Sequence, residues 1–360
     1  MESISGVRGP VLRRGAEGFD GERAGFQTAS RHEPDVLVGA TGAEDVRAAV
    51  TFAAERGLPV TVEATGHGRA VPALGGVLIQ TRRMTGVSVD PAGRTVRIEA
   101  GVRWGQVIDA AAVHGLTPLS GSSPEVGAVG YTLGGGLGLL ARTYGYAADH
   151  VRSIDVVTGD GEARHVTADS DPDLFWALRG GGGGFGVVTA LEIDLVPVAT
   201  IYGGTLFFAA GPDVLAAFQE WTALVPEELT SSVGMMTFPD VPGAPESLRG
   251  RFVASVHLAF AGAAAEGERL VAPLWAAGPV LRDTLAEMPF AASASIHNDP
   301  DGAPRVHGHQ RAGVGPRRRR AGRRPRHRRT GRARLELRED QPLGWGARAA
   351  AGRRERGRAP

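Results

Sequence analysis

Apolar and polar positions follow both helical and strand-like periods, which predicts a protein that mixes helices and strands. Apolar residues recur at helical spacing from Val46 to Ala53, so a helix is predicted there. Thr41 and Glu44 have the spacing of a capping box at its start, and Gly57 ends it. Strands are predicted on either side of this helix, at 35–38 and 60–62.

Further along the chain, the pattern predicts two hairpins and a second group of helices and strands. The hairpin turns are Asp90–Gly93 and Thr158–Gly161, which carry turn-forming residues. A short helix is predicted at 172–178, with Phe175 and Trp176 facing inward. The remaining predicted strands are 87–89, 95–98, 153–157, 163–166 and 187–196; further helices are predicted at 104–113 and 214–224, and apolar segments at 205–210 and 252–260.

Composition places the chain among folded proteins. It has 360 residues, 42% of them apolar, and no cysteine, so disulfides, thiolate metal sites and cysteine nucleophiles are excluded. No apolar run approaches the length needed to span a bilayer, and the N-terminus lacks a secretory pattern. We therefore expect a cytoplasmic protein with no membrane partner and no metal.

The near-neutral charge conceals a basic tail. Residues 305–360 hold 19 arginines and four acidic residues, although the whole chain has a net charge of only +1. Three interpretations are open: a nucleic-acid-binding arm, a plain disordered tail, and a reading frame that slips near Pro304. The absence of Phe, Tyr and Ile after Ile296 favours the slipped frame, so we do not expect nucleic acid to be a partner.

Three glycine-rich segments point to a phosphate-bearing cofactor. They are 64–70, 121–138 and 180–186, and such segments expose consecutive backbone N–H groups. The alternative is that they are ordinary turns. A Rossmann site is excluded for Gly181-x-Gly183-x-x-Gly186, because this motif follows a predicted helix and opens a strand, whereas the fingerprint requires the reverse.

The motifs, taken in order, resemble one known family. They are Val62-Glu63-Ala64-Thr65-Gly66-His67-Gly68, Glu99–Trp104, Gly121-Ser122-Ser123-Pro124-Glu125-Val126-Gly127, Gly134–Gly138, Arg142–Gly145, Asp173–Gly180 and Gly184–Thr189. Together they resemble the berberine-bridge-enzyme-like FAD-linked oxidoreductases of the vanillyl-alcohol-oxidase / p-cresol-methylhydroxylase superfamily. The match is strong over 30–197 and weaker over 198–304.

The resemblance implies an α+β fold with two parts. A two-subdomain FAD-binding domain of the p-cresol-methylhydroxylase type is expected at 30–197, after an N-terminal segment at 1–29. An incomplete α+β substrate domain is expected at 198–304, followed by the Arg-rich disordered tail at 305–360. Family members continue well beyond the position of Pro300, so we expect this chain to be poorly stable or inactive even if it binds FAD.

The resemblance also implies the cofactor site. The first loop is expected to hold the pyrophosphate, the second segment the ribityl chain and ring, and the last residues the adenosine end. The expected FAD-binding residues are Ala64, Thr65, Gly66, His67, Gly68, Arg69, Ala70, Val71, Gly121, Ser122, Gly127, Gly130, Tyr131, Thr132, Leu133, Tyr144, Gly186, Val187 and Val188.

His67 occupies the place of the histidine that the family bonds to the flavin ring, which predicts covalent FAD. Relatives often add a second bond through a cysteine where this chain has Ser123, so attachment through His67 only is expected. The family often has Arg-Ser-Gly-Gly-His where this chain has 63–67. Glu63 would repel a pyrophosphate unless it points away, and Arg69 is expected to supply the positive charge.

The reaction implied by the resemblance is oxidation of a small molecule, either an alcohol, a sugar or a secondary metabolite, with dioxygen as acceptor. The general base is expected in the second domain, and no residue is distinguished by sequence. The alternative is a catalytically degenerate flavoprotein or a basic-tailed binding protein. Candidate bases are Tyr202, Glu220, His257, His297 and Asp299.

Overall fold

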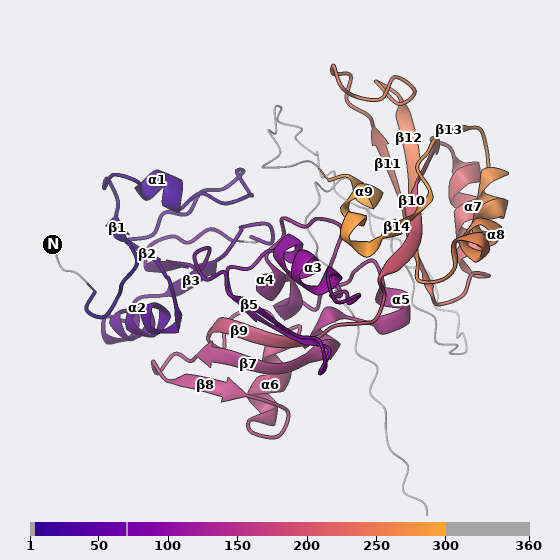
Figure 1. The fold of residues 1–360 in the computed structure, drawn as a ribbon. Helices are drawn as coiled ribbons and strands as arrows, with labels where there is room; N and C mark the ends of the chain where they lie inside the picture. The colour runs from indigo at the N-terminus through magenta and orange to yellow at the C-terminus, as the bar shows by residue number, and fades with distance from the viewer. Residues whose placement is uncertain (1–3, 70, 300–360) are drawn as a thin grey trace, which may run out of the picture. The chain divides into compact units, whose positions relative to one another are not determined.

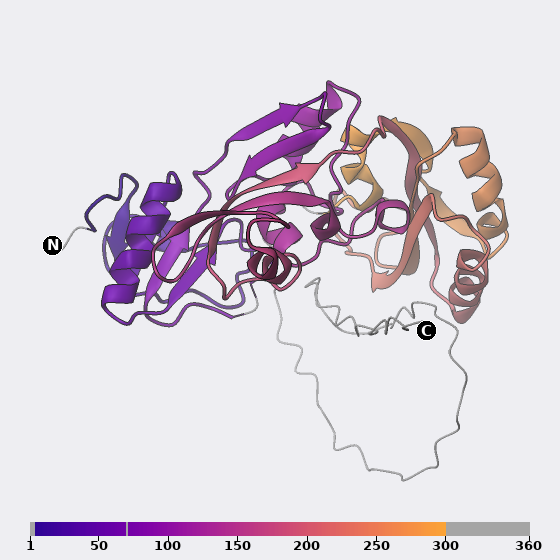
Figure 2. The ribbon, with the colours of Figure 1, turned by 90° about the horizontal axis from the view of Figure 1, so that it is seen from below.

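The computed structural model describes residues 4–69 and 71–299. The expectations for the tail at 305–360, and for Ala70 in the first glycine-rich loop, lie outside the described residues. Within the described ranges, three separate sheets are formed (Figures 1 and 2). No helix there is long and apolar enough to cross a membrane.

The first sheet contains the predicted strand–helix–strand unit. Its strand order is β1 (Val11–Arg13), β2 (Val36–Gly39), β4 (Val77–Gln80) and β3 (Val60–Glu63). β4 pairs in parallel with both β2 and β3, which requires a crossover connection. Helix α2 (Ala43–Glu55) supplies it between β2 and β3.

Both faces of this sheet are covered, which explains its continuous apolar strands. Val38 and Ile79 pack against the apolar stripe of α2. Leu37 and Leu78 pack on the opposite face against Phe19 of the short helix α1 (Phe19–Glu22). The segment before β2 thus contributes a strand, β1, and a helix, α1, to the fold.

The second sheet is antiparallel and contains both predicted hairpins. Its order is β5 (Val87–Asp90), β6 (Thr95–Glu99), β9 (Val187–Asp194), β7 (Val151–Val157) and β8 (Ala163–Val166). The largest apolar cluster of the described residues lies against it, with Trp104 fully buried. The helices associated with this part are α3 (Trp104–Ala112), α4 (Ala128–Leu133), α5 (Ala141–Tyr144), η1 (Ala147–His150) and α6 (Pro172–Leu178).

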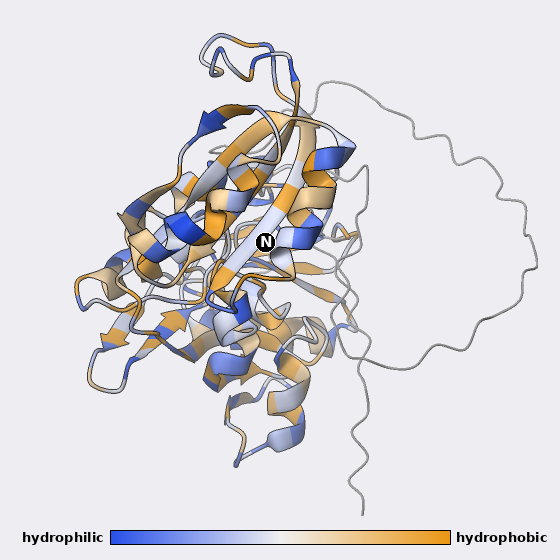
Figure 3. Ribbon diagram, turned by 90° about the vertical axis from the view of Figure 1, so that its right-hand side faces the viewer, coloured by the Kyte–Doolittle hydropathy of each residue, from blue (hydrophilic) through white to orange (hydrophobic). Residues whose placement is uncertain are grey.

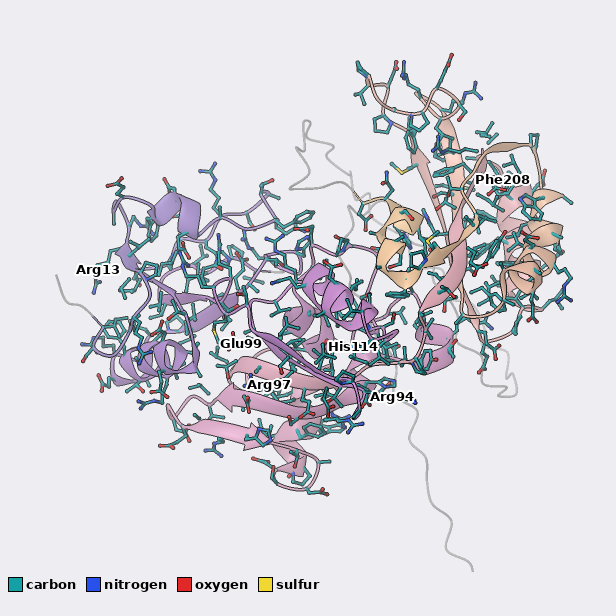
Figure 4. The ribbon with its side chains drawn as sticks, viewed as in Figure 1. Arg13, Arg94, Arg97, Glu99, His114 and Phe208 are labelled. Carbon is teal, nitrogen blue, oxygen red and sulfur yellow. The ribbon has the colours of Figure 1, made fainter. Side chains whose placement is uncertain are left out.

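The third sheet belongs to the segment after residue 197. Its order is β11 (Leu229–Thr237), β12 (Phe252–Phe260), β10 (Thr200–Ala209) and β13 (Val280–Asp283), and β14 (Ala286–Pro289) pairs with the first part of β10. Helices α7 (Pro212–Thr222) and α8 (Ala264–Trp275) cover one face, where Phe208 is fully buried (Figure 4). Both helices alternate apolar and polar positions (Figure 3). The segment ends with η2 (Phe290–Ala292) and α9 (Ala294–His297).

Two local predictions are wrong. Trp176 of α6 is 75% exposed, whereas Phe175 is buried as expected, so only one of the two aromatic residues faces the core. The predicted capping box also fails, because the Asp45 carboxylate, and not Glu44, accepts the hydrogen bonds from the backbone N–H and hydroxyl of Thr41. Asp45 also accepts from the backbone of Arg8 and Gly9, which ties the N-terminal segment to α2.

Candidate functional site: a glycine-lined dinucleotide site

The first glycine-rich loop follows β3 and presents free backbone donors. The N–H groups of the four residues from Thr65 to Gly68 donate to no other group among the described residues. Gly66 has φ +79°, and a Cβ there would lie 2.9 Å from the backbone nitrogen of Phe26. Consecutive free amides around a left-handed glycine form an anion-binding concavity.

Two contacts hold the His67 imidazole in this loop. The ring stacks on Phe26 with centroids 3.9 Å apart and planes 16° apart, and Nδ1 lies 2.8 Å from Oγ1 of Thr65. The backbone carbonyl of His67 accepts a hydrogen bond from the Gln27 side chain. The ring is therefore fixed before any ligand binds.

The surroundings of His67 keep its imidazole neutral. Burial and then the Arg103 guanidinium lower the pKa of His67, against the smaller opposing effects of the Glu125 and Asp299 carboxylates. Because the ordinary pKa is 6.5, the side chain is uncharged at neutral pH. A neutral imidazole is the nucleophilic form.

Glu63 points away from the loop into a buried polar network. Its carboxylate binds Arg69 through two hydrogen bonds of 2.7 and 2.8 Å, and also His32 and Gln80. Arg69 further donates to the carbonyls of Gln27 and Ser30. The expected repulsion of a phosphate by Glu63 is thereby removed. Arg69, however, is engaged by Glu63 and does not offer the free positive charge we expected of it.

The second glycine-rich segment joins the first through one hydrogen bond. The Gly127 backbone N–H, at the start of α4, donates to Oγ1 of Thr65 at 3.3 Å. Within this segment the Tyr131 ring packs edge-on to Trp104, and a Cβ on Gly121 would lie 3.1 Å from that ring. Glycine at 121 thus allows the backbone to close on Tyr131.

Two buried hydroxyls, one within this segment and one directly before it, have no hydrogen-bond partner among the described residues. The Oη of Tyr131 and the Oγ of Ser120 are buried and make no hydrogen bond within the described part of the chain. Burial raises the pKa of the Tyr131 phenol well above its ordinary value, so it is a neutral donor. Unpartnered buried hydroxyls are costly, and a polar ligand alongside them would remove that cost.

The third glycine-rich segment reaches the second through Gly182, whose N–H donates to the Leu133 carbonyl at 2.9 Å. All three segments are therefore linked. Val187 and Val188 in β9 are buried side chains of the two larger cores, and Gly186 lies against Val157. No contact among the described residues connects these three residues directly to His67.

Five further residues of the expected set are Tyr144, Gly130, Thr132, Gly68 and Val71. Tyr144 is half-buried in α5, and its carbonyl accepts a hydrogen bond from His150. Thr132 is fully buried, and its hydroxyl donates a hydrogen bond to the Ala128 carbonyl. Gly130 and Gly68 have open space where a Cβ would stand, and Val71 is 72% exposed, so these three leave room beside the loops.

The segment after residue 197 meets the second glycine-rich segment at Ser122. The Ser122 hydroxyl donates to the Asp299 carboxylate at 2.6 Å. Asp299 also acts electrostatically on His67, His257 and His297. The structure thus gathers three of the five candidate bases, His257, His297 and Asp299, on the side of the first and second segments.

The other two candidate bases lie elsewhere. Tyr202 is 3% exposed and packs in the core under α8, where a Cβ on Gly267 would touch its ring. Glu220 is exposed on α7, the helix that covers the opposite face of the third sheet. Neither residue is placed to act at the glycine-lined site.

His257 stands in a polar row that crosses the third sheet. Its strand register places it between Thr205 of β10 and Ser232 of β11. Its Nδ1 bonds Thr205 and the Ile296 carbonyl, and its Nε2 bonds Ser255. The His297 ring stacks on it with centroids 4.2 Å apart.

Both imidazoles are neutral at neutral pH. Burial lowers the pKa of His257, and burial together with repulsion from His257 lowers the pKa of His297 to about 4. The Asp299 carboxylate opposes both shifts. The pair can therefore accept a proton or a hydrogen bond without carrying charge beforehand.

A pocket of about 260 Å³ lies beside this junction. It is formed by α3, the loop 121–125 and the η2–α9 segment, and Ser122 is one of its lining residues. Asp109 and Glu125 contribute carboxylates, and Glu125 is paired with Arg103. The pocket can hold a small molecule where the loop 121–125 lies next to the η2–α9 segment.

Sequence reasoning missed the contribution of the N-terminal segment. The backbone N–H groups of Phe26 and Gln27 donate to the carbonyls of Thr65 and Gly66, which forms one wall of the site, and His32 joins the Glu63 network. These residues lie about 40 positions before the loop and carry no motif. No signal in a single sequence connects them to His67.

Comparisons with known proteins find matches to flavoproteins. Residues 34–167 match the family described as an FAD binding domain. The chain is 35% identical over 191 residues to the (R)-6-hydroxynicotine oxidase of Paenarthrobacter nicotinovorans, an alignment that covers 52% of this chain and 42% of that enzyme. The chain therefore spans less than half the length of this relative.

Solved structures of oxidases have a similar fold. The 6-hydroxy-D-nicotine oxidase of Arthrobacter nicotinovorans matches with a TM-score of 0.74 and 27% identity, over 82% of this chain and 65% of that one. A chitooligosaccharide oxidase matches with a TM-score of 0.70 and 25% identity, over 81% of this chain and 61% of that one.

The residues present fit FAD. The free amides of the first loop suit a pyrophosphate, the unpartnered hydroxyls of Ser120 and Tyr131 suit a polar ring system, and the neutral His67 suits the flavin's electrophilic edge. The described fold thus contains an FAD binding domain match at 34–167, followed by the third sheet and its helices. In addition, the chain is similar in sequence and fold to FAD-linked oxidases.

Proposed function

We propose that the chain is an FAD-dependent oxidase of a small alcohol, sugar or secondary metabolite, with dioxygen as the electron acceptor. The observation that carries this proposal is the row of free N–H groups from Thr65 to Gly68 beside a neutral, fixed imidazole. FAD, when bound, supplies a two-electron hydride acceptor. The protein supplies binding, orientation and proton handling.

The chain's residues divide these tasks. The amides of Thr65–Gly68 hold the diphosphate, and the hydroxyls of Ser120 and Tyr131 bind polar atoms of the ring or ribityl chain. Phe26 covers one face of the His67 imidazole. Because Arg69 is bound to Glu63, the diphosphate is held by backbone dipoles at this loop.

His67 is the proposed point of covalent attachment, and attachment is single because position 123 is serine. An imidazole nitrogen of His67 would hold the flavin through its 8α carbon and would give up its proton. The bound flavin, with dioxygen as the oxidant, would take up the electron pair that this linkage releases. The neutral state of His67 supports this step.

The His257–His297 pair is the proposed proton acceptor for the substrate hydroxyl or amine. Hydrogen bonds with Thr205 and Ser255 fix the His257 ring, while the ring of His297 stacks on it. Asp299 connects the pair to Ser122. Of the five candidate bases, only this cluster lies at the junction with the glycine-lined segments.

The test uses the full chain purified without flavin and then mixed with FAD. Flavin absorbance that remains with the protein after gel filtration supports the site, and absorbance that survives acid precipitation supports attachment. Anaerobic bleaching by 6-hydroxynicotine, chitooligosaccharides or simple alcohols, reversed by air with release of peroxide, supports the oxidase. Bound flavin without bleaching by any of them would make the chain a flavoprotein without this activity.

A further inference from the structure

His32 lies in the buried polar network around Glu63 and bridges two parts of the chain. The residue is 1% exposed. Its Nδ1 accepts a hydrogen bond from the backbone N–H of Ala73 at 2.7 Å, and its Nε2 lies 3.0 Å from Oε2 of Glu63. Glu63 is the last residue of β3, and Ala73 belongs to the connection from β3 to β4. One imidazole therefore links the beginning of this connection, which contains the first glycine-rich loop, to its later part.

The two partners of His32 leave one neutral form of the ring. A backbone N–H can only donate, so Nδ1 must direct its lone pair at Ala73. The proton of the neutral ring is therefore on Nε2, from which it is donated to the Glu63 carboxylate. The tautomer follows from the chemistry of these two partners alone.

The bond from His32 completes the set of donors around the Glu63 carboxylate. Oε2 accepts from Nε of Arg69 and from His32, and Oε1 accepts from Nη2 of Arg69 and from Gln80. An ionised carboxylate has about four lone-pair sites, so all of them are used. Because Arg69 directly follows Gly68, this carboxylate anchors the end of the row of free amides.

We propose that His32 is a positioning residue whose Nε2-protonated form holds the connection from β3 to β4 in the shape that presents the free amides to a diphosphate. This inference rests on the proposed binding of FAD at this loop and adds the side chain that prepares the loop. A loop that is ordered before its ligand arrives binds more tightly, since less conformational entropy is lost on binding.

A second proton on the His32 ring is incompatible with this arrangement. It would place an N–H on Nδ1, opposite the Ala73 N–H at 2.7 Å, so that two donors would face each other. Imidazoles gain a second proton as the pH falls, and the loop should then lose its prepared shape. The charged residues that bond the ring, its backbone carbonyl or these partners are Glu63, Arg69, Arg23 and Glu33.

The test titrates the full chain and three variants with FAD at neutral pH. His32→Gln keeps both contacts, because its amide oxygen can accept from Ala73 and its amide nitrogen can donate to Glu63. His32→Leu removes both, and His114→Gln is the control at an exposed position. His32→Leu should bind FAD about tenfold more weakly than wild type, as expected for two lost hydrogen bonds, whereas the other two should match wild type. Equal affinity in His32→Leu would overturn the proposal.

The pH profile of FAD affinity separates positioning from a general loss of stability. On acidification from neutral pH, the wild type should lose FAD affinity more steeply than His32→Gln. Glutamine cannot take up a proton, and the two proteins share every other titratable group. Profiles that run parallel, or a steeper loss in His32→Gln, would contradict the role of His32. This comparison also decides the proposal if His32→Leu fails to fold.

Deuterium exchange of the Ala73 amide gives a readout that does not depend on flavin. In the flavin-free chain this amide should be protected in the wild type and in His32→Gln and should exchange faster in His32→Leu. If the wild type binds no FAD at neutral pH, the proposed function is wrong, and this exchange still decides whether His32 holds the connection. Equal protection of the amide in all three proteins would show that it does not.

Discussion

The hydroxyl of Ser122 donates to the carboxylate of Asp299 across 2.6 Å, although 177 positions separate the two residues in the chain. This contact joins the loop of the FAD-binding domain to the end of α9. It also places one negative charge near three histidines, namely His67, His257 and His297. The charge of Asp299 therefore influences both the proposed attachment residue and the proposed proton acceptors.

Replacing Asp299 by asparagine should lower the pKa of all three histidines. The carboxylate raises each of these pKa values, and Asn keeps the shape and an acceptor for Ser122 while removing the charge. Proton NMR titration of the histidine ring signals measures the effect. Ser122→Ala is the comparison, because it keeps the charge and should produce a smaller change. Unchanged titration curves in Asp299→Asn would show that the carboxylate is not near the rings.

Replacing His257 by glutamine should raise the pKa of His297 from its value of about 4. Burial is the main cause of that low pKa, and repulsion by His257 is the second, so removal of the neighbouring imidazole relieves part of the shift. NMR titration of His297 measures it. His114→Gln, at an exposed position after α3 (Figure 4), is the control and should leave His297 unchanged. If the pKa of His297 is the same in His257→Gln as in the wild type, the claim that the stacked His257 ring lowers it is contradicted.

Glu63→Gln should destabilise the protein by about 3 kcal/mol at neutral pH, because it leaves the Arg69 guanidinium buried without its counter-charge. Burial acts to raise the pKa of Glu63, but hydrogen bonds from Arg69 and His32 outweigh it, and the pKa lies below the ordinary 4.5. The stability contributed by this carboxylate is therefore present above pH 4.5 and is lost as pH falls below it.

Urea unfolding of wild type and Glu63→Gln across that pH range checks the prediction. The difference in the free energy of unfolding between wild type and Glu63→Gln should be largest near neutral pH and should become smaller below pH 4.5. Glu44→Gln is the matched control, because Glu44 forms an exposed pair with Arg47 and should cost less than about 0.5 kcal/mol. If this difference in the free energy of unfolding grows as the pH falls, the stabilising role of the buried Glu63–Arg69 pair is contradicted.

Gly25→Ala should weaken both stability and FAD binding. A Cβ at Gly25 would lie 2.5 Å from Oε1 of Glu63 and 2.5 Å from Nη2 of Arg69, so the network beneath the loop must move, at a cost of about 1–3 kcal/mol. Gly21→Ala is the control, since nothing lies within 4 Å of its Cβ position and alanine favours the helix. Thermal unfolding with and without FAD measures both effects. Equal melting temperatures for the two variants would contradict the packing.

Elements with clear periodicity were predictable from the sequence, and elements without it were not. The stripe from Val46 to Ala53 and the turn at Asp90–Gly93 gave α2 and the β5–β6 hairpin correctly. β4 was missed because Val77–Gln80 is buried on both faces, which removes the alternation of a half-exposed strand. Trp176 was placed inward because aromatic residues usually are buried, but the turn of α6 leaves it in solvent.

The candidate site was predictable where it depends on local backbone chemistry. Gly66 and Gly127 could be proposed as site residues from the sequence, because a loop whose backbone approaches a phosphate needs glycine. The long-range partners were not readable. Phe26 stacks on His67 from 41 positions away and Asp299 reaches Ser122 from the end of α9, and no local pattern encodes such contacts. The pairing of Glu63 with Arg69 also required the structure, since each residue alone suggested a different role.

The binding of FAD to the loop after β3 is tested most directly by titrating the flavin-free full chain with FAD and measuring the flavin absorbance retained after gel filtration. One FAD per chain is expected for the wild type and for Gly42→Ala, whose Cβ position is open. Gly66→Ala should bind at least about tenfold more weakly, because alanine at φ +79° is strained and crowds Phe26. A wild-type chain that retains no flavin at saturating FAD, or a Gly66→Ala variant that binds it equally well, would contradict the site described.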